Sequence, residues 1–176
     1  DNVPLSYPHI LGFNLHLELM VNKFFPFPVI GLVHIRNEMT CKRVIKLNEE
    51  LDINAYLSGN KISSKGIEFC ITTEVIIKGE VVWRSISTYL FRKKSSSQTN
   101  NAQQVENKAL KYQHQQSWYL PESLGRHYAL ISGDSNPIHL HSVTAKFFGF
   151  ERAIAHGMWL KAKAISSLQT LHKSSA

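Results

Sequence analysis

The sequence predicts an α+β fold in which a buried helix precedes an antiparallel sheet. Residues 10–20 are apolar on nearly all sides, as in a largely buried helix. Residues 67–91 instead alternate between apolar and polar side chains, as half-buried strands do. A polar stretch at residues 95–116 then interrupts both patterns, which predicts a linker between two units.

The first unit is expected to hold one helix and five strands. Pro8 favours a helix start, because proline fits the first turn, and the aromatic and proline-rich residues 24–28 end the helix. Gly79 predicts a hairpin turn between the two longest strands. The strands are expected at residues 32–35, 42–47, 53–57, 67–78 and 80–91, with Phe69, Ile71, Thr73, Val75 and Ile77 on one face of the fourth.

The second unit is expected to be helical. Pro121 begins a helix that runs to about residue 131, and a short amphipathic run follows at residues 141–148, with Ser142 as its N-cap. A longer helix extends from Gly157 to about residue 171. The predicted domains are therefore an amino-terminal unit at 1–94, a polar linker at 95–116 and a carboxy-terminal unit at 117–176.

A tight turn after residue 132 carries the chemistry. Gly133 and Asn136 accept unusual backbone angles, and Pro137 pushes the residue before it out of the helical region. The turn therefore holds Asp134 at a loop tip and His139 at the mouth of the same loop. Both side chains are predicted to face one pocket, as an acid/base pair.

Gly157 adds a third group to this pair. Its backbone N–H lies in the unpaired first turn of the last helix, which favours negative charge, and a glycine lets a carbonyl oxygen approach. An acid/base pair beside an oxyanion donor suits removal of a proton next to a carbonyl, with departure of a β-hydroxyl.

The same residues carry a family resemblance. Residues 128–139, with Asp134-Ser-Asn136-Pro-Ile-His139 at their end, and Ala155-His156-Gly157-Met158 after them resemble the signature of MaoC-like (R)-specific enoyl-thioester hydratases, which have the hot-dog fold. The resemblance implies an antiparallel sheet wrapped around a long central helix. It also implies that Asp134 and His139 hold the water that is added or removed, and that the Gly157 amide polarises the thioester carbonyl. Which of the two side chains takes the α-proton is left open.

Three further residues are assigned to substrate binding: Ser132, Asn136 and His156. By ordinary turn chemistry, Ser132 and Asn136 shape the loop rather than react. No metal site is expected, and no cofactor beyond the coenzyme A or acyl carrier protein that carries the acyl thioester substrate.

The bulk properties narrow the choice of partners. The net charge of +7 favours an anionic partner, such as phosphate-bearing coenzyme A or an acidic carrier protein. No nucleic acid is expected, because the basic clusters lack interleaved aromatic residues. No membrane insertion is expected either. Cys41 and Cys70 are too few for a disulfide framework and are predicted to be buried thiols in a cytoplasmic protein.

A weak internal repeat indicates parts of two hot-dog units. His9 and the helix after it resemble His156 and its helix, but the first copy has Ile10 at the position of Gly157 and no matching turn before it. The amino-terminal unit is therefore expected to lack catalytic residues and to shape the substrate tunnel. The carboxy-terminal unit is expected to be incomplete, so a homodimer or a further hot-dog unit should cover its long helix.

Three functions are consistent with the sequence. The first is a hydro-lyase that interconverts (3R)-3-hydroxyacyl and trans-2-enoyl thioesters. The second is a hot-dog thioesterase, and the third is a catalytically inactive acyl-thioester-binding subunit. The pairing of Asp134 with His139 favours the first, because hydration needs both a base and an acid near the β-carbon.

Overall fold

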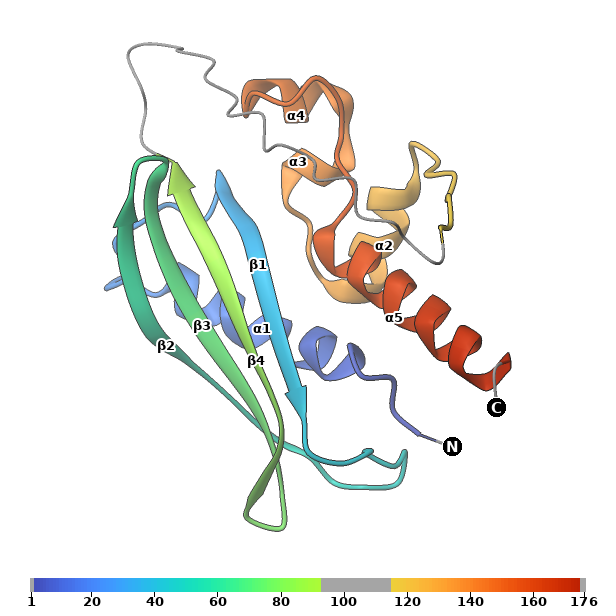
Figure 1. Cartoon of the computed structure of the whole chain (residues 1–176). Coiled ribbons are helices and arrows are strands. Elements are labelled where there is room, and N and C mark those ends of the chain that lie inside the picture. The colour runs from blue at the N-terminus through green and yellow to red at the C-terminus, as the bar shows by residue number, and fades with distance from the viewer. Residues whose placement is uncertain (1, 93–114, 175–176) are drawn as a thin grey trace.

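The fold has a four-stranded antiparallel sheet on one side and helices on the other (Figure 1). It is described by a computed structural model that covers residues 2–92 and 115–174. The strand order is β1-β4-β3-β2, which confirms the α+β class. The elements are α1 (Tyr7–Val21), β1 (Leu32–Cys41), β2 (Asp52–Ser63), β3 (Gly66–Ile77), β4 (Glu80–Arg92), α2 (Leu124–Ser132), α3 (Pro137–Leu140), α4 (Ser142–Phe147) and α5 (Gly157–Ser174).

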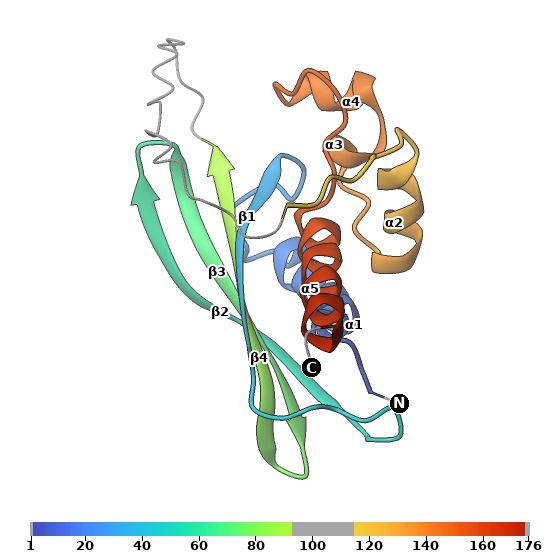
Figure 2. The same cartoon turned by 45° about the vertical axis from the view of Figure 1, so that its right-hand side comes forward.

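Helix α1 lies across one face of the sheet, and α5 lies on the same side (Figures 1 and 2). Gly12 permits this close approach, because a Cβ at that position would lie 2.8 Å from Thr73 Cγ2. Helix α5 is attached to β1 through Lys161, whose Nζ donates to the Asn37 backbone oxygen at 2.7 Å and to its Oδ1 at 2.6 Å. Helix α1 therefore packs closely against β3, and α5 is attached to the edge strand β1.

The predicted hairpin is confirmed. Strands β3 and β4 pair directly, and Lys78 and Gly79 between them have φ of 51° and 83°, the left-handed values that a tight hairpin turn requires. The predicted buried face of β3 is confirmed too, because its five side chains are all at most 5% exposed: Phe69, Ile71, Thr73, Val75 and Ile77.

Three strand predictions were wrong, and one of them is β2, which was expected at residues 53–57 but extends from Asp52 to Ser63. Residues 42–47 form no strand, and of these Lys46 alone makes an isolated bridge, to Asn2. Ile45 of this segment is buried for another reason: it is 3% exposed and packs with Val75 and Trp83 in a core cluster. Strand β1 was also predicted too short, because its later residues are mostly polar on an edge strand.

A bulge interrupts β1 immediately after His34. His34 pairs with Tyr89 of β4, but the next pair is Arg36 with Thr88, so Ile35 is an extra residue and is exposed. Bulges of this kind bend a strand and re-aim its side chains. This bulge sets the direction of β1 next to His34.

The helices of the second half follow the predicted order. Helix α2 ends at Ser132, and Gly133 caps it in the left-handed region with φ of 75°. The N-cap of α4 is His141, so the prediction for Ser142 was wrong by one residue. Most of the predicted linker at 95–116 lies outside the described residues, and the domain boundaries stay predictions.

Both cysteines are free, but Cys41 is exposed, which corrects the prediction that both thiols are buried; Cys70 is half-buried in β3. In the part of the chain that the structure describes, none of the helices combines the length and apolar character needed to cross a membrane.

Candidate active site

The loop after α2 is held by hydrogen bonds between neighbouring residues. The Ser132 hydroxyl donates to the Tyr128 carbonyl at 2.9 Å and accepts the Asp134 backbone N–H at 3.2 Å. Asp134 Oδ1 in turn accepts the backbone N–H of Asn136 at 3.2 Å. Such side-chain-to-backbone bonds favour a turn over continued helix, so Ser132 and Asp134 fix the local geometry.

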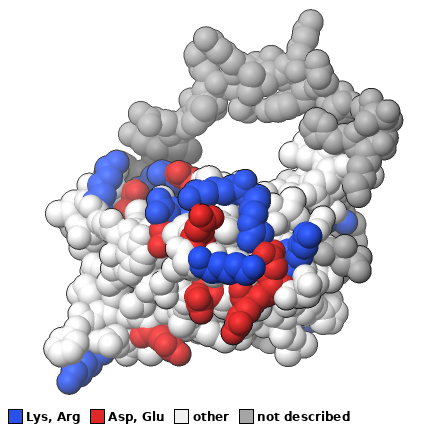
Figure 3. Space-filling view, turned by 90° about the horizontal axis from the view of Figure 1, so that it is seen from below, with Lys and Arg blue, Asp and Glu red and all other residues white. Residues whose placement is uncertain are grey.

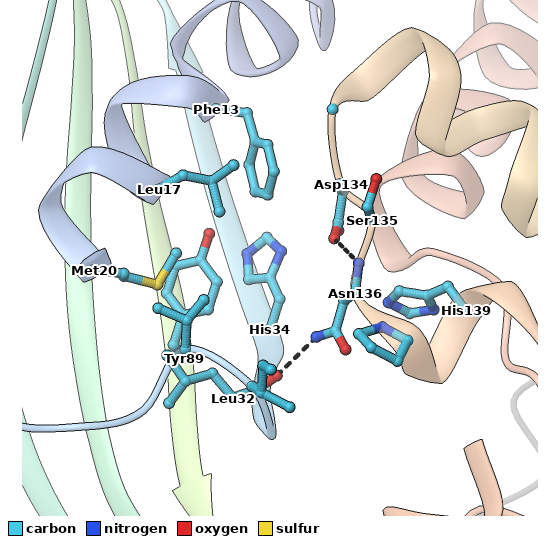
Figure 4. Close-up of a pocket in the computed structure, with 14 residues that line it drawn as sticks. Phe13, Leu17, Met20, Leu32, His34, Tyr89, Asp134, Ser135, Asn136 and His139 are labelled. Carbon is cyan, nitrogen blue, oxygen red and sulfur yellow. Dashed lines mark hydrogen bonds between the residues drawn. The ribbon is translucent and has the colours of Figure 1, made fainter. Parts of the chain in front are cut away.

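Asn136 attaches this loop to the sheet. Its Nδ2 donates to the Leu32 carbonyl of β1 at 3.0 Å, and its Oδ1 accepts the Ile138 backbone N–H at the start of α3 (Figure 4). One amide thus spans two parts of the chain that are about a hundred residues apart. Asn136 therefore fixes the distance between the loop and the edge of β1.

A cavity of about 230 Å³ lies between the loop and α1. Asp134 and His139 both line it, as the sequence predicted, and Asn136 does as well. Figure 4 shows the loop on one side and apolar side chains of α1 on the other. The remaining lining residues are Phe13, Leu17, Met20, Val29, Ile30, Leu32, His34, Tyr89, Gly133, Ser135 and Pro137.

His139 is buried and held in one orientation. Its Nδ1 donates to the Ile154 carbonyl at 2.8 Å, so in the neutral ring Nε2 carries the free lone pair. Burial is the largest cause that lowers the pKa of His139 below 6.5, and the neighbouring His156 lowers it further. The hydrogen bond to the Ile154 carbonyl and the charge of Asp134 raise this pKa in part. His139 is therefore a neutral imidazole near pH 7, and its Nε2 is the atom that can accept a proton.

His156 lies behind this pair rather than in the cavity wall. It is 2% exposed, and its ring stacks on His139 with centroids 3.9 Å apart. Its Nε2 donates to the Asp134 carbonyl at 2.9 Å, and the same nitrogen is 3.9 Å from Asp134 Oδ2. Neither His156 nor Ser132 lines the cavity, so their assignment to substrate binding stays a prediction.

The donor atoms of Asp134, His139 and His156 lie within 4.8 Å of one another, close enough to be considered as metal ligands. The two imidazole rings, however, are stacked at an interplanar angle of 28°. Two of the candidate ligand atoms are also used in hydrogen bonds, His139 Nδ1 to the Ile154 carbonyl and His156 Nε2 to the Asp134 carbonyl. This geometry favours hydrogen bonding over metal binding, and the expectation of no metal stays a prediction.

Gly157 is the first residue of α5 and is exposed. It does not line the cavity that Asp134 and His139 share. A Cβ at this position would meet nothing within 4 Å, so the space beside its amide is open. Its role as a carbonyl-binding amide stays a prediction.

His139 also borders a second and larger space. This groove of about 780 Å³ runs past α2 and the segment before α5, and its wall includes Arg152, Ile154 and Leu160. His139 therefore borders both spaces, the cavity and a groove whose wall carries a basic residue, Arg152, and an acidic one, Glu122.

The amino-terminal unit was expected to shape the substrate tunnel, but none of its residues that line the cavity was predicted by name. Phe13, Leu17 and Met20 line it from α1, and His34 and Tyr89 line it from the sheet. The spacing of Phe13, Leu17 and Met20 by four and three residues marks one helix face, which was available as a signal. His34 and Tyr89 could not be linked by pattern, since only strand pairing brings them together.

The surface charge is mixed on the face shown in Figure 3. Lysine and arginine side chains alternate there with aspartate and glutamate, without a continuous basic stripe. Among the described residues, Arg43 forms an ion pair with Glu49, and Arg84 forms one with Glu74. Acidic and basic side chains are thus mixed on the face that Figure 3 shows, although the chain as a whole has a net charge of +7.

Known proteins show similarity to both halves of the chain. Residues 97–171 match the family model described as a MaoC like domain. Over 169 residues the chain is 27% identical to 3-hydroxyacyl-thioester dehydratase X of Mycobacterium tuberculosis, covering 96% of this chain and 60% of that protein. The chain thus spans about three fifths of the length of this curated relative.

Two solved structures share the fold. The crystal structure of HtdX of Mycobacterium tuberculosis superposes with a TM-score of 0.77 at 27% identity, covering 94% of this chain and 63% of that one. A structure titled MaoC-like dehydratase gives a TM-score of 0.69 at 16% identity, covering 92% and 61%. The sheet and helices therefore form a hot-dog fold like that of MaoC dehydratases.

Proposed function

Because the chain carries a MaoC-like dehydratase domain and is homologous to a 3-hydroxyacyl-thioester dehydratase, we propose that it interconverts (3R)-3-hydroxyacyl and trans-2-enoyl thioesters. The observation that carries the proposal is the shared cavity of Asp134 and His139. One is a carboxylate and the other is a neutral imidazole with a free Nε2. Together they supply the two proton-transfer groups that the addition and removal of water require.

The reaction balances with these two groups alone. In dehydration, the α-proton leaves C2 for one of them, and the electron pair moves toward the thioester carbonyl. The β-hydroxyl then leaves C3 as water, taking up the proton that was removed from C2, which reaches it from the same group or through the other, and the C2–C3 double bond forms. Hydration is the reverse. Acid/base partners of this kind contribute roughly 10² to 10⁴ in rate.

The two spaces beside His139 suggest how the substrate lies. The cavity is apolar toward α1, where Leu17 and Met20 would contact the acyl chain. The groove on the other side of His139 contains Arg152, whose charge suits the phosphate groups of coenzyme A or of a carrier protein. The Gly157 amide at the start of α5 would then bind the thioester carbonyl.

The assembly of the whole protein is also a proposal. The exposed apolar residues Leu130 and Ile131 of α2 and Val143 and Phe147 of α4 would be covered by a second copy or by a further hot-dog unit. In this proposal the residues up to 94 belong to one hot-dog unit, and those from 117 belong to part of another.

A turnover assay on the purified chain tests the proposed reaction. Crotonyl-coenzyme A should lose its enoyl absorbance without release of free thiol. Thiol release without loss of the double bond would instead identify a thioesterase. Binding of the thioester with neither change would identify an acyl-binding subunit, and either result would overturn the proposal.

A further inference from the structure

The cavity wall opposite the Asp134 loop is not wholly apolar. His34 of β1 and Tyr89 of β4 form a directly paired cross-strand couple, and their rings stack with centroids 4.8 Å apart and an interplanar angle of 20°. Both residues line the same cavity as Asp134 and His139. Figure 4 shows the two rings between the Asp134 loop and the apolar side chains of α1.

The two rings differ in their hydrogen bonds. The Tyr89 hydroxyl is 2.9 Å from His16 Nδ1, whose other nitrogen is 2.6 Å from Thr73 Oγ1. His34 Nε2, by contrast, is a buried nitrogen that has no hydrogen-bond partner among the described residues. An unpaired buried polar atom is costly, and such atoms are rare enough in folded proteins that each one calls for an explanation.

The two groups assigned to proton transfer, Asp134 and His139, both influence the pKa of His34. Burial is the main cause that lowers the pKa of His34 to about 4. Asp134 and a hydrogen bond with the Arg36 backbone raise this pKa in part, whereas Lys161 and His139 lower it further. At neutral pH the ring is therefore uncharged, with one nitrogen that donates and one that accepts.

We propose that His34 is a substrate-binding residue that hydrogen-bonds the β-oxygen, the atom added to or removed from the acyl chain. The proposal rests on the proposed function, because it places this oxygen between Asp134 and His139 on one wall and His34 on the other. A strand of the amino-terminal half then contributes a polar group at the reacting carbon, where the sequence predicted only a shaping role.

His9 provides a matched control. Its ring stacks on that of His34, with centroids 5.7 Å apart, and its Nδ1 is also buried without a hydrogen-bond partner in the described part of the chain. His9, however, does not line the cavity. A purely structural role for buried imidazoles predicts that His9→Leu and His34→Leu have the same effect on ligand binding, whereas substrate contact predicts different effects.

The test compares two ligands that differ only in the β-oxygen. Affinities of (3R)-3-hydroxybutyryl-pantetheine and butyryl-pantetheine are measured by NMR titration of the chain with Asp134→Asn, so that the ligand is not consumed. Pantetheine is the part that coenzyme A and acyl carrier protein share. The ratio of the two affinities cancels any general damage to the cavity, as in a double-mutant cycle.

The ratio should fall roughly 5- to 10-fold in His34→Leu, the factor expected for one net hydrogen bond. It should stay within about twofold in His9→Leu, and His34→Gln, which keeps a donor and an acceptor, should recover part of the loss. An unchanged ratio in His34→Leu, an equal fall in His9→Leu, or no binding of either thioester with His34 intact overturns the proposal.

A second measurement leaves His34 in place, in case His34→Leu does not fold. The ring-nitrogen resonances of His34 should shift with the 3-hydroxybutyryl ligand and not with the butyryl ligand; equal shifts overturn the proposal. If the chain does not turn over crotonyl-coenzyme A but His34→Leu still lowers the affinity ratio, only the proposed reaction is overturned. If the chain turns over crotonyl-coenzyme A and His34→Leu leaves the affinity ratio unchanged, only the role of His34 is overturned.

Discussion

Asp134 and His139 are the two side chains on which the proposed chemistry depends. We predict that Asp134→Asn and His139→Gln each lower kcat/KM for crotonyl-coenzyme A by roughly 10² to 10⁴, because each removes a proton-transfer group. Initial rates and a thermal melt would be measured for each variant. Ser135→Ala is the control, since Ser135 lines the same cavity on the same loop, and it should stay within a few-fold. Near-normal rates in either variant would remove the acid/base assignment.

The protonation state of His139 makes a separate prediction. Because burial and His156 lower its pKa below 6.5, the neutral form persists into mild acid. Protonation of His139 removes the lone pair at Nε2, so kcat/KM should be flat near neutral pH and fall on the acid side with an apparent pKa below 6.5. A pH–rate profile checks this, with circular dichroism at each pH to confirm the fold. An acid limb centred above that value would contradict it.

Gly157 can be tested without disturbing the fold. A side chain there meets nothing within 4 Å, so Gly157→Val should melt close to the parent. If the amide binds the thioester carbonyl, the branched side chain blocks the approach, and the loss of one oxyanion donor lowers kcat by roughly 10² to 10³. Unchanged kinetics in a folded Gly157→Val variant would remove this role.

At the scale of elements, α2 and α3 touch at Gly125. A Cβ on Gly125 would lie 1.8 Å from the His139 carbonyl oxygen, so a side chain is impossible without moving α3. We predict that Gly125→Ala lowers the free energy of unfolding by at least about 2 kcal/mol, as overpacked backbone contacts do. Urea unfolding would measure it, and Gly59→Ala in β2 is the control, because a Cβ there meets nothing within 4 Å. Equal stability of the two variants would refute this contact.

Some elements could be predicted from the sequence and others could not. The β3–β4 hairpin and the turn from Gly133 to Pro137 depend on local residue types and alternation, so both were predicted correctly. Residues 42–47 were predicted to form a strand because they read as a short apolar or alternating run, yet Ile45 is buried by packing in a cluster with Trp83 and not by strand pairing. Local patterns do not distinguish these two causes of burial.

The residues of the site likewise divide into those that the local sequence predicts and those that it does not. Asp134 and His139 are five residues apart, and the turn between them brings both to one cavity. His34 and Tyr89 enter the same cavity only through the β1–β4 register and the position of α1, which depend on contacts between distant residues. The loop could therefore be predicted from the sequence, whereas the opposite wall required the fold.

For the molecule as a whole, buried imidazoles should make stability depend on pH. Burial lowers the pKa of His16 and of His34 from 6.5 to about 4 in the folded state. Between these values the unfolded chain binds more protons, so acidification favours unfolding, and at pH 5 each of the two costs about 2 kcal/mol of stability relative to pH 7. Urea unfolding from pH 7 to pH 5 measures the slope.

A pair of variants assigns this slope to residues. His16 is fully buried between Tyr89 and Thr73, whereas His127 is exposed on α2. His16→Gln should lower overall stability but flatten the dependence on pH, and His127→Gln should leave the dependence as it is. A slope that is the same in the two variants would show that other groups cause it.

The hydrogen bond from Asn136 to the Leu32 carbonyl joins two parts of the chain that are 104 residues apart. On the proposed function, the later part holds the proton-transferring loop and the earlier part holds the surface that recognises the acyl group. Substitutions on that surface would therefore give a descendant a new substrate while its reaction stays the same. The Asn136 amide would be the constraint common to all such descendants, because it keeps the two regions in register.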